Sequence, residues 1–325
     1  MRRRALTVVA VVVALALSGC TPLVTSSATP TPTPTRTPTP TATPTPAPST
    51  ASAVPVLAFG GDCASVFADP RAVLGFDPTL RQIETPTGLG TLGGLRCEWT
   101  AVDDIWEGLA FTALPVLQVP HELRSRYETT ACDWSYDTLY CHLAASAGGT
   151  WVMVSKEALD DSGTPPDLAP VLTAALESAS VAPEPVAASP TTEWWEPVDC
   201  AALESAAGIA EVFAPHTFES SWPGGAYSWP TDALLAPTDQ WCPWYSYDAG
   251  VGVWLNVLPG AGSVWDGSDF EGGTPVDVAG AQDAVIMPSA GGDVLYATDG
   301  ANVLRIRESP IPMPDLAARI FAAMP

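Results

Sequence analysis

A series of short matches recurs in the same order in two parts of the chain, and this internal repeat limits the folds that the sequence can adopt. The matched segments are 62–63 with 199–200, 97–99 with 242–244, 108–115 with 252–259, 139–140 with 295–296, and 166–169 with 314–317. The offset is 137 residues for the first match (199 minus 62) and 148 residues for the last (314 minus 166), and between them it drifts by steps the size of loop insertions. Chance similarity in an alanine-rich chain is the alternative, but the unbroken order favours two copies of one domain.

The repeat sets the expected domain boundaries. We expect a signal peptide at 1–19, a tethering segment at 20–58, the first copy at 59–182, a linker at 183–193 and the second copy at 194–325. Each copy has the length of an ordinary single domain.

Each copy has the pattern helix, strands, helix. Asp199 precedes Cys-Ala-Ala-Leu and is a suitable helix cap, while the segments after each Cys-x-Trp are rich in strand-forming residues. Apolar residues then recur at helical spacing, with Asp167 at the expected cap; they are Leu168, Val171, Leu172, Ala175, Leu176 and Ala179 in copy one, and Leu316, Ile320, Phe321 and Met324 in copy two. The sequence therefore predicts an α+β fold, with two tandem antiparallel sheets flanked by N- and C-terminal helices.

The cysteines predict a disulfide-stabilised protein. Apart from Cys20, copy one contains four cysteines and copy two contains two, which are the even numbers expected of an exported chain. Cys63 and Cys200 occupy equivalent positions, as do Cys97 and Cys242, so we expect the bridges Cys63–Cys97, Cys200–Cys242 and Cys132–Cys141. Because residues i and i+2 share one face of a strand, Trp99 and Trp244 should pack beside two of these bridges.

The N-terminus has the features of an export signal. Three arginines at 2–4 precede the uncharged apolar run at 5–17, which is too short for a stable membrane-spanning helix. Leu-Ser-Gly-Cys at 17–20 resembles the lipobox of bacterial lipoproteins, and the resemblance implies that Cys20 is acylated and becomes the mature N-terminus. An uncleaved membrane helix is the alternative. The resemblance places the protein on the extracytoplasmic face of the cell membrane, lipid-anchored.

A low-complexity stalk follows Cys20. Proline occupies every second position in much of 29–48, so this segment should adopt an extended polyproline II conformation and form a disordered linker. The alternating threonines are candidates for O-glycosylation, although an unmodified tether is equally compatible with the sequence. The lipobox, the stalk and the paired Cys…Cys-x-Trp domains together resemble a group of two-copy actinobacterial envelope lipoproteins. This resemblance implies a secreted module that binds a ligand or partner, with no catalytic residues to carry over.

The charge of the chain limits its partners. The chain has 13 basic and 36 acidic residues, and removal of the three signal arginines leaves 10 minus 36, or a net charge of −26. Such a surface repels nucleic acid and anionic lipid, so we expect no nucleic-acid partner and membrane attachment through the acyl chains alone. The remaining candidate partners are a cell-wall component and an envelope protein.

The sequence contains no recognised catalytic motif, so we expect a non-enzymatic protein without cofactor or metal. His121, His142 and His216 have no metal-binding spacing and are expected on the surface or in loops. No Gly-x-Ser-x-Gly motif, phosphate-binding loop or Ser-x-x-Lys motif occurs. A cell-wall glycan hydrolase that uses unrecognised carboxylates remains the alternative, because the spacing of an acid pair requires coordinates.

Aromatic residues are concentrated in copy two, which contains eight of the 12 tryptophans. Aromatic side chains among Gly, Pro and Ser can form flat surfaces that stack on sugars or bury against a protein partner. The candidate ligand-binding residues are Trp222, Trp229, Trp241, Tyr245 and Trp265. The alternative is that these rings only fill the core of the domain.

Overall fold

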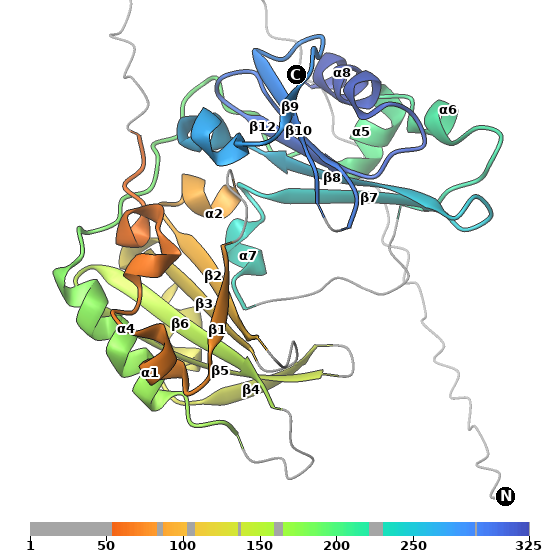
Figure 1. Ribbon diagram of the computed structural model, residues 1–325. Coiled ribbons are helices and arrows are strands. Elements are labelled where there is room, and N and C mark those ends of the chain that lie inside the picture. The colour runs from red at the N-terminus through yellow and green to blue at the C-terminus, as the bar shows by residue number, and fades with distance from the viewer. Residues whose placement is uncertain are drawn as a thin grey trace, which may run out of the picture. The chain divides into compact units, whose positions relative to one another are not determined.

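The computed structural model describes residues 54–82, 87–102, 108–135, 138–158, 165–220, 230–289 and 291–324. These residues form two antiparallel six-stranded sheets with helices, so the predicted α+β architecture is confirmed (Figure 1). The signal segment, Cys20 and the Thr/Pro-rich stalk lie outside the described residues. Within those residues, no helix combines the length and apolar character needed to cross a membrane.

The first sheet has the strand order β1-β2-β3-β6-β5-β4, and every neighbouring pair is antiparallel. Its strands are β1 (Pro78–Gln82), β2 (Leu95–Ala101), β3 (Gly108–Pro115), β4 (Ala131–Ser135), β5 (Thr138–Ala147) and β6 (Thr150–Glu157). The accompanying helices are α1 (Pro70–Leu74), α2 (Gly88–Thr91), α3 (His121–Arg126) and α4 (Ala169–Val181), with 3-10 turns at Ala58–Gly61, Cys63–Ser65 and Val116–Gln118. Helices α1 and α4 cover one face of this sheet (Figure 1).

The second sheet has the order β7-β8-β12-β11-β10-β9 and is also antiparallel throughout. Its strands are β7 (Gln240–Ser246), β8 (Val251–Leu258), β9 (Thr274–Pro275), β10 (Asp283–Met287), β11 (Val294–Thr298) and β12 (Val303–Arg307). The helices are α5 (Cys200–Ala206), α6 (Ile209–Phe213), α7 (Asp232–Leu235) and α8 (Met313–Ala323), with 3-10 turns at Ala261–Val264 and Gly267–Phe270. Helices α5, α6 and α8 supply the residues that pack on one face of this sheet.

Five strands of each sheet share one topology, which is the strongest structural sign that the two halves are copies. The order β2-β3-β6-β5-β4 in the first sheet corresponds to β7-β8-β12-β11-β10 in the second. The register also agrees, because Cys97 lies opposite Phe111 while Cys242 lies opposite Leu255, 144 residues after Phe111 (255 minus 111). Strands β1 and β9 extend opposite edges of the shared sheet; within the described residues, the second copy has only the isolated bridge between Glu219 and Tyr245 on the edge that β1 occupies in the first copy.

One predicted match, Leu139-Tyr140 with Leu295-Tyr296, is wrong. Leu143 lies opposite Val154, and Leu295 lies opposite Ile306, the equivalent of Val154, so Leu295 corresponds to Leu143. Strand β5 runs from Thr138 to Ala147 and is longer than β11, which runs from Val294 to Thr298. Leu139 and Tyr140 therefore lie in the part of β5 that has no equivalent in the shorter β11, and their match with Leu295 and Tyr296 is a chance similarity.

The predicted helix starts are confirmed, except that the N-cap of α4 is one residue later than expected. Asp62 and Asp199 each accept a hydrogen bond from the backbone N–H two residues later, at 2.8 and 2.9 Å, and so cap the opening turns of the two copies. Asp167 accepts the N–H of Ala169 at 3.2 Å, although the N-cap of α4 is Leu168. The buried face of α4 includes four of the predicted residues, Val171, Leu172, Ala175 and Ala179, and Leu168 beside it is buried too.

All three predicted disulfides are present in the core of the copies. They are Cys63–Cys97, Cys132–Cys141 and Cys200–Cys242, with Cα–Cα distances of 5.7, 4.0 and 5.5 Å. Trp99 shares a core cluster with the first bridge, and Trp244 packs in the cluster that contains Cys242. Both indoles are 1% exposed, so the two Cys-x-Trp motifs play the same packing role in each copy.

The segment expected as a linker packs on the first copy. Val186 pairs with Val56 in an antiparallel bridge, and the N–H of Ala188 donates to the carbonyl of Thr91 at 2.9 Å. The chain that leaves copy one therefore runs alongside the segment that enters it.

Residues of the second copy also contact the first. Leu234 and Leu235 of α7 pack against the apolar cluster on the face of the first sheet opposite α4, which includes Leu89, Leu114 and Trp151. The hydroxyl of Thr238 donates to the carbonyl of Gly88 at 3.1 Å, and a Cβ at position 88 would clash with the carbonyl of Thr238. Glycine at position 88 thus permits close contact between α2 and the segment before β7.

Candidate functional site

The five aromatic residues selected from the sequence have different surroundings. Trp222 and Trp229 lie outside the described residues. Trp241 and Tyr245 are on the edge strand β7, where they share the face opposite the core residues Cys242 and Trp244. Trp265 lies beyond β8 and does not join them.

Trp241 forms a stacked pair with Trp254, a residue that the sequence reasoning did not select. Their ring centroids are 5.7 Å apart and their planes differ by 8°. Trp241 is 37% exposed and Trp254 is partly buried, so the pair presents an indole surface beside a sheet edge. Two nearly parallel indoles on neighbouring strands form a rigid apolar platform, which we call the tryptophan platform.

The tryptophan platform is not required by the fold. Its equivalent positions in the first sheet are Arg96 and Ala110, which lie one residue before Cys97 and one residue before Phe111. The first copy therefore builds the same strands without aromatic residues at these two places. This comparison argues against the alternative that Trp241 and Trp254 serve only to fill a core.

Tyr245 extends the aromatic face along β7. It lies four residues after Trp241, which places it about 13 Å away on the same face of the strand. Its ring contacts that of Tyr247 edge-on at 5.0 Å, and Tyr247 is 53% exposed. The described aromatic surface of copy two therefore follows the edge strand.

Trp265 belongs to a separate apolar cluster. Its ring centroid lies 4.5 Å from that of Phe270, and Phe270 in turn contacts Tyr296 at 5.2 Å. The indole N–H donates to the carboxylate of Asp283 at 3.2 Å. These contacts indicate a packing role for Trp265, which is the role that the core-filling alternative assigns to the aromatic residues of copy two.

Three polar residues beside the tryptophan platform were missed by the sequence reasoning. Asn256 lies opposite Trp241 across β7 and β8, and Arg305 lies opposite Asn256 across β8 and β12. The amide nitrogen of Asn256 donates to Asp239 at 2.8 Å, and its amide oxygen accepts from Nη2 and Nε of Arg305 at 3.0 and 3.3 Å. One asparagine thus holds a carboxylate on one side and a guanidinium on the other.

Asp239 sits in an environment that disfavours its charge. Burial raises the pKa of this carboxyl above its usual value, and the opposing effects of Arg305 and of the Asn256 hydrogen bond are smaller. The only sequence signal for this cluster is a polar asparagine within the otherwise apolar strand VGVWLNVL.

A cavity of about 160 Å³ opens beside this cluster. Asp239 and Arg305 line it together with Thr87 and Arg96. Arg96 is already neutralised by Glu98, with Nη2 and Oε1 3.4 Å apart. Apolar groups complete the wall, namely Leu57, Leu89, Leu95 and Leu235 with Gly61 and Gly94.

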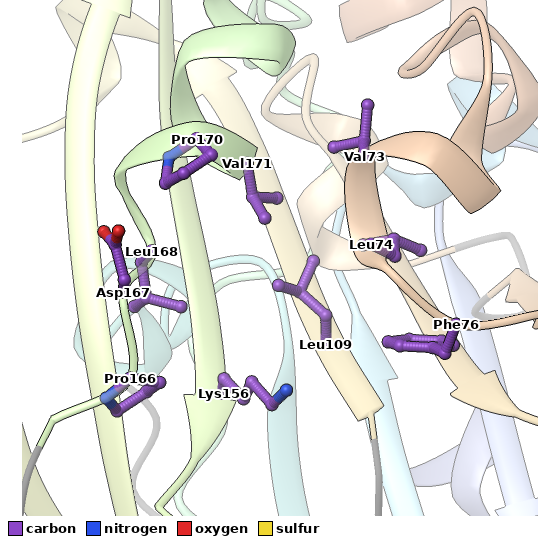
Figure 2. A pocket seen from close by; sticks show the side chains of 10 residues that line it. All are labelled: Val73, Leu74, Phe76, Leu109, Lys156, Pro166, Asp167, Leu168, Pro170 and Val171. Carbon is purple, nitrogen blue, oxygen red and sulfur yellow. The ribbon is translucent and has the colours of Figure 1, made fainter.

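A second cavity, of about 200 Å³, lies in the first copy between α1, α4 and the sheet (Figure 2). Figure 2 shows Leu74, Leu109 and Val171 around it, with the amine of Lys156 on one side. The carboxylate of Asp167 accepts the backbone N–H of Ala169 at the start of α4. This cavity is mainly apolar and has no cluster of polar groups comparable with that around Asn256.

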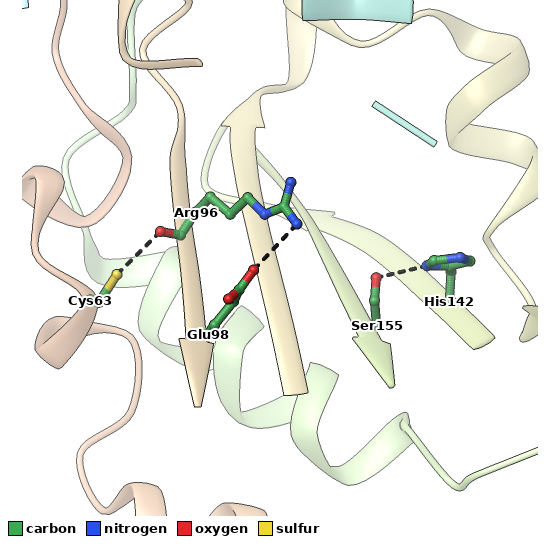
Figure 3. A network of polar contacts seen from close by, with 5 residues as sticks. All are labelled: Cys63, Arg96, Glu98, His142 and Ser155. Carbon is green, nitrogen blue, oxygen red and sulfur yellow. Dashed lines mark hydrogen bonds and ion pairs between the residues drawn. The ribbon is translucent and has the colours of Figure 1, made fainter. Parts of the chain in front are cut away.

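His142 is not in a loop or on the surface, so the expectation for this histidine is wrong. It lies in β5, is 2% exposed, and its Nδ1 is 2.7 Å from the hydroxyl of the buried Ser155 (Figure 3). The ring of Tyr127 packs edge-on against it at 5.3 Å. His121 and His216 are exposed as expected. Because both His142 and Ser155 are buried, we assign their contact a structural role.

We expect His142 to make the fold sensitive to mild acid. Burial lowers the pKa of His142 from 6.5 to about 4, so the unfolded state binds more protons between these values. Stability is then fully present above pH 6.5 and falls as the pH decreases toward 4, by up to roughly 3 kcal/mol from this group.

The measurement is urea unfolding of the wild type and of His142→Asn, whose amide can replace Nδ1 in the contact with Ser155. We expect a shallower loss of stability between pH 6.5 and 4 in His142→Asn than in the wild type. His121→Asn, at an exposed site, is the control and should follow the wild type. An identical dependence of the unfolding free energy on pH in all three proteins would show that His142 is not the source of the acid sensitivity.

The described residues contain no group of three or more His, Cys, Asp or Glu side chains arranged to hold a metal ion. Searches of protein-family models, of curated proteins and of solved structures find no match to this chain.

Proposed function

We propose that the protein is a lipoprotein anchored on the extracytoplasmic face of the membrane, and that it binds a cell-wall glycan without catalysis through the tryptophan platform. The anchor follows from the lipobox at 17–20 and the location follows from the export signal. The observation that carries the binding role is the stacked, partly exposed pair Trp241 and Trp254.

The shape and charge of the surface favour a neutral sugar chain. Flat aromatic faces bury the apolar faces of sugar rings at small entropic cost, because an indole has only two side-chain torsions. The mature chain carries a net charge of −26 (10 minus 36), so an anionic wall polymer would be repelled. An extended ligand stacked on Trp241 would continue along β7 toward Tyr245, whose backbone pairs with Glu219, and toward Tyr247.

The test is retention of residues 21–325, which lack only the signal segment and Cys20, on purified insoluble wall material. We expect Trp241→Ala and Trp254→Ala each to weaken binding at least tenfold, or about 1.4 kcal/mol, because each removes half of the stack. Trp134→Ala is the matched control, because Trp134 is a 70% exposed tryptophan of the first copy. Equal retention of wild type and both platform variants would refute the proposal.

The same incubation distinguishes a binding protein from a glycan hydrolase. Under our proposal the wall material releases no soluble sugar above a no-protein control. Release that is abolished by a single Asp or Glu substitution, with retention unchanged, would favour the hydrolase alternative instead.

A further inference from the structure

The cavity beside Asn256 combines two opposite charges with an apolar wall. Asp239 and Arg305 both line it, and Asn256 lies between them as a shared hydrogen-bond partner. In the described part of the chain these two side chains form no ion pair within 4.0 Å. An acid and a base that share one small cavity are thus held by a neutral amide and not by each other.

Both charged groups keep hydrogen-bonding capacity for a ligand. The guanidinium of Arg305 has five N–H donors, and its two hydrogen bonds both go to the single oxygen of Asn256. The carboxylate of Asp239 accepts one hydrogen bond, from the amide of Asn256 through Oδ1. The guanidinium of Arg305 can bind the carboxylate of a ligand, and the carboxylate of Asp239 can bind a ligand's ammonium group. Together the two side chains are complementary to a zwitterion.

The remaining wall specifies an apolar substituent. Four leucines line the cavity together with Gly61 and Gly94, and the wall is completed by Thr87 and by Arg96, which pairs with Glu98. The cavity volume of about 160 Å³ is many times the roughly 10–15 Å³ that a single water requires. A small ligand with a carboxylate, an ammonium group and an aliphatic side chain would use each part of this wall.

We propose that this cavity is a binding site for a free aliphatic α-amino acid, with its carboxylate on Arg305, its ammonium group on Asp239 and its side chain among the leucines. The site lies beside the tryptophan platform, but neither Trp241 nor Trp254 lines the cavity. Its wall comes from both copies, with Leu89 and Leu95 from the first and Leu235 and Arg305 from the second. A bound amino acid therefore contacts both copies and strengthens the junction between them.

The experiment compares leucine with two analogues that each lack one charge. Isothermal titration and thermal melting of residues 21–325, which retain Leu57 and the Val56–Val186 bridge, are measured with leucine, with 4-methylpentanoate, which lacks the amino group, and with isopentylamine, which lacks the carboxylate. The aliphatic amino acids from glycine to isoleucine, in both L and D forms, complete the panel. We expect a saturable rise in melting temperature with at least one amino acid, and binding at least tenfold weaker for the corresponding single-charge analogues.

Two variants assign the charges. Asp239→Asn should bind the amino acid at least tenfold more weakly and should no longer prefer leucine to 4-methylpentanoate. Arg305→Gln should no longer prefer leucine to isopentylamine. Arg319→Gln, at an exposed residue of α8 paired with Glu211, is the control and should bind as the wild type does. Asp239→Asn keeps an oxygen acceptor for Asn256, so its fold should be retained.

Three outcomes would overturn the proposal. They are no binding anywhere in the panel, equal binding of leucine and 4-methylpentanoate, and unchanged affinity in folded Asp239→Asn. Wall retention is measured in the same variants and should be preserved. A failure of the amino-acid site is therefore distinguishable from a failure of the tryptophan platform.

Discussion

Cys20→Ser is expected to abolish lipid attachment completely. Under the proposed anchor the Cys20 sulfur is the acyl acceptor, and two or three acyl chains would contribute about 0.8 kcal/mol per buried CH₂ to membrane binding. Cells fed a radiolabelled or clickable fatty acid should label the wild type and leave Cys20→Ser unlabelled. The variant should also keep its signal segment and migrate as a larger precursor.

The control for this experiment is a double variant at another cysteine pair. Cys132→Ala with Cys141→Ala removes two cysteines of the first copy and leaves position 20 intact. It should incorporate fatty acid as the wild type does. Labelling of Cys20→Ser, or absence of label from the wild type, would remove the basis for the proposed anchor.

Removal of the Cys200–Cys242 bridge is expected to cause the largest loss of folding stability. The two cysteines are 42 residues apart, and in the chain-entropy model a closed loop of that size contributes about 4 kcal/mol. Cys242 is fully buried beside Trp244, so truncation also disturbs packing in the second core. Urea unfolding of Cys200→Ala with Cys242→Ala measures the loss.

The shorter bridge Cys132–Cys141 tests whether the entropy of loop closure explains this loss of stability. Cys132 and Cys141 are only nine residues apart, so their double alanine variant should lose about 2.5 kcal/mol. The prediction therefore concerns the order of the two losses as well as their size. An equal or larger loss for the short loop would contradict the loop-entropy explanation.

The disulfides and the repeat could be predicted because they depend on signals that are local or duplicated. Cys63–Cys97 and Cys200–Cys242 occupy equivalent places, which left Cys132 and Cys141 as the remaining pair. The buried apolar face of α4 was predictable because apolar residues at helical spacing can be recognised in the sequence. These features require no knowledge of which strands are neighbours.

Features that depend on strand pairing could not be predicted. Among the described residues, β9 has no strand counterpart in the first copy, and the second copy matches β1 only with the isolated bridge between Glu219 and Tyr245, so the repeat gave no indication of either strand. His142 resembles a surface residue in sequence but lies opposite Ser155 in a buried part of the sheet. Its neighbour was visible only once β5 and β6 were placed in register.

The candidate site was only partly predictable for the same reason. Trp241 and Tyr245 could be selected because aromatic residues are concentrated in copy two. Trp254, Asn256 and Arg305 come from β8 and β12, and only the register of three strands brings them to one face beside Trp241. The first copy has Arg96 and Ala110 where the second has Trp241 and Trp254, so the fold itself does not require the two tryptophans.

We propose that the mature protein is acylated at Cys20 and oxidised at its six other cysteines, as an extracytoplasmic location requires. The most direct test is mass spectrometry of protein extracted from membranes with detergent and alkylated without reduction. We predict that the mature chain begins at an acylated Cys20 and that none of the other cysteines is alkylated. An unmodified residue 20, or six alkylated cysteines before reduction, would contradict the account.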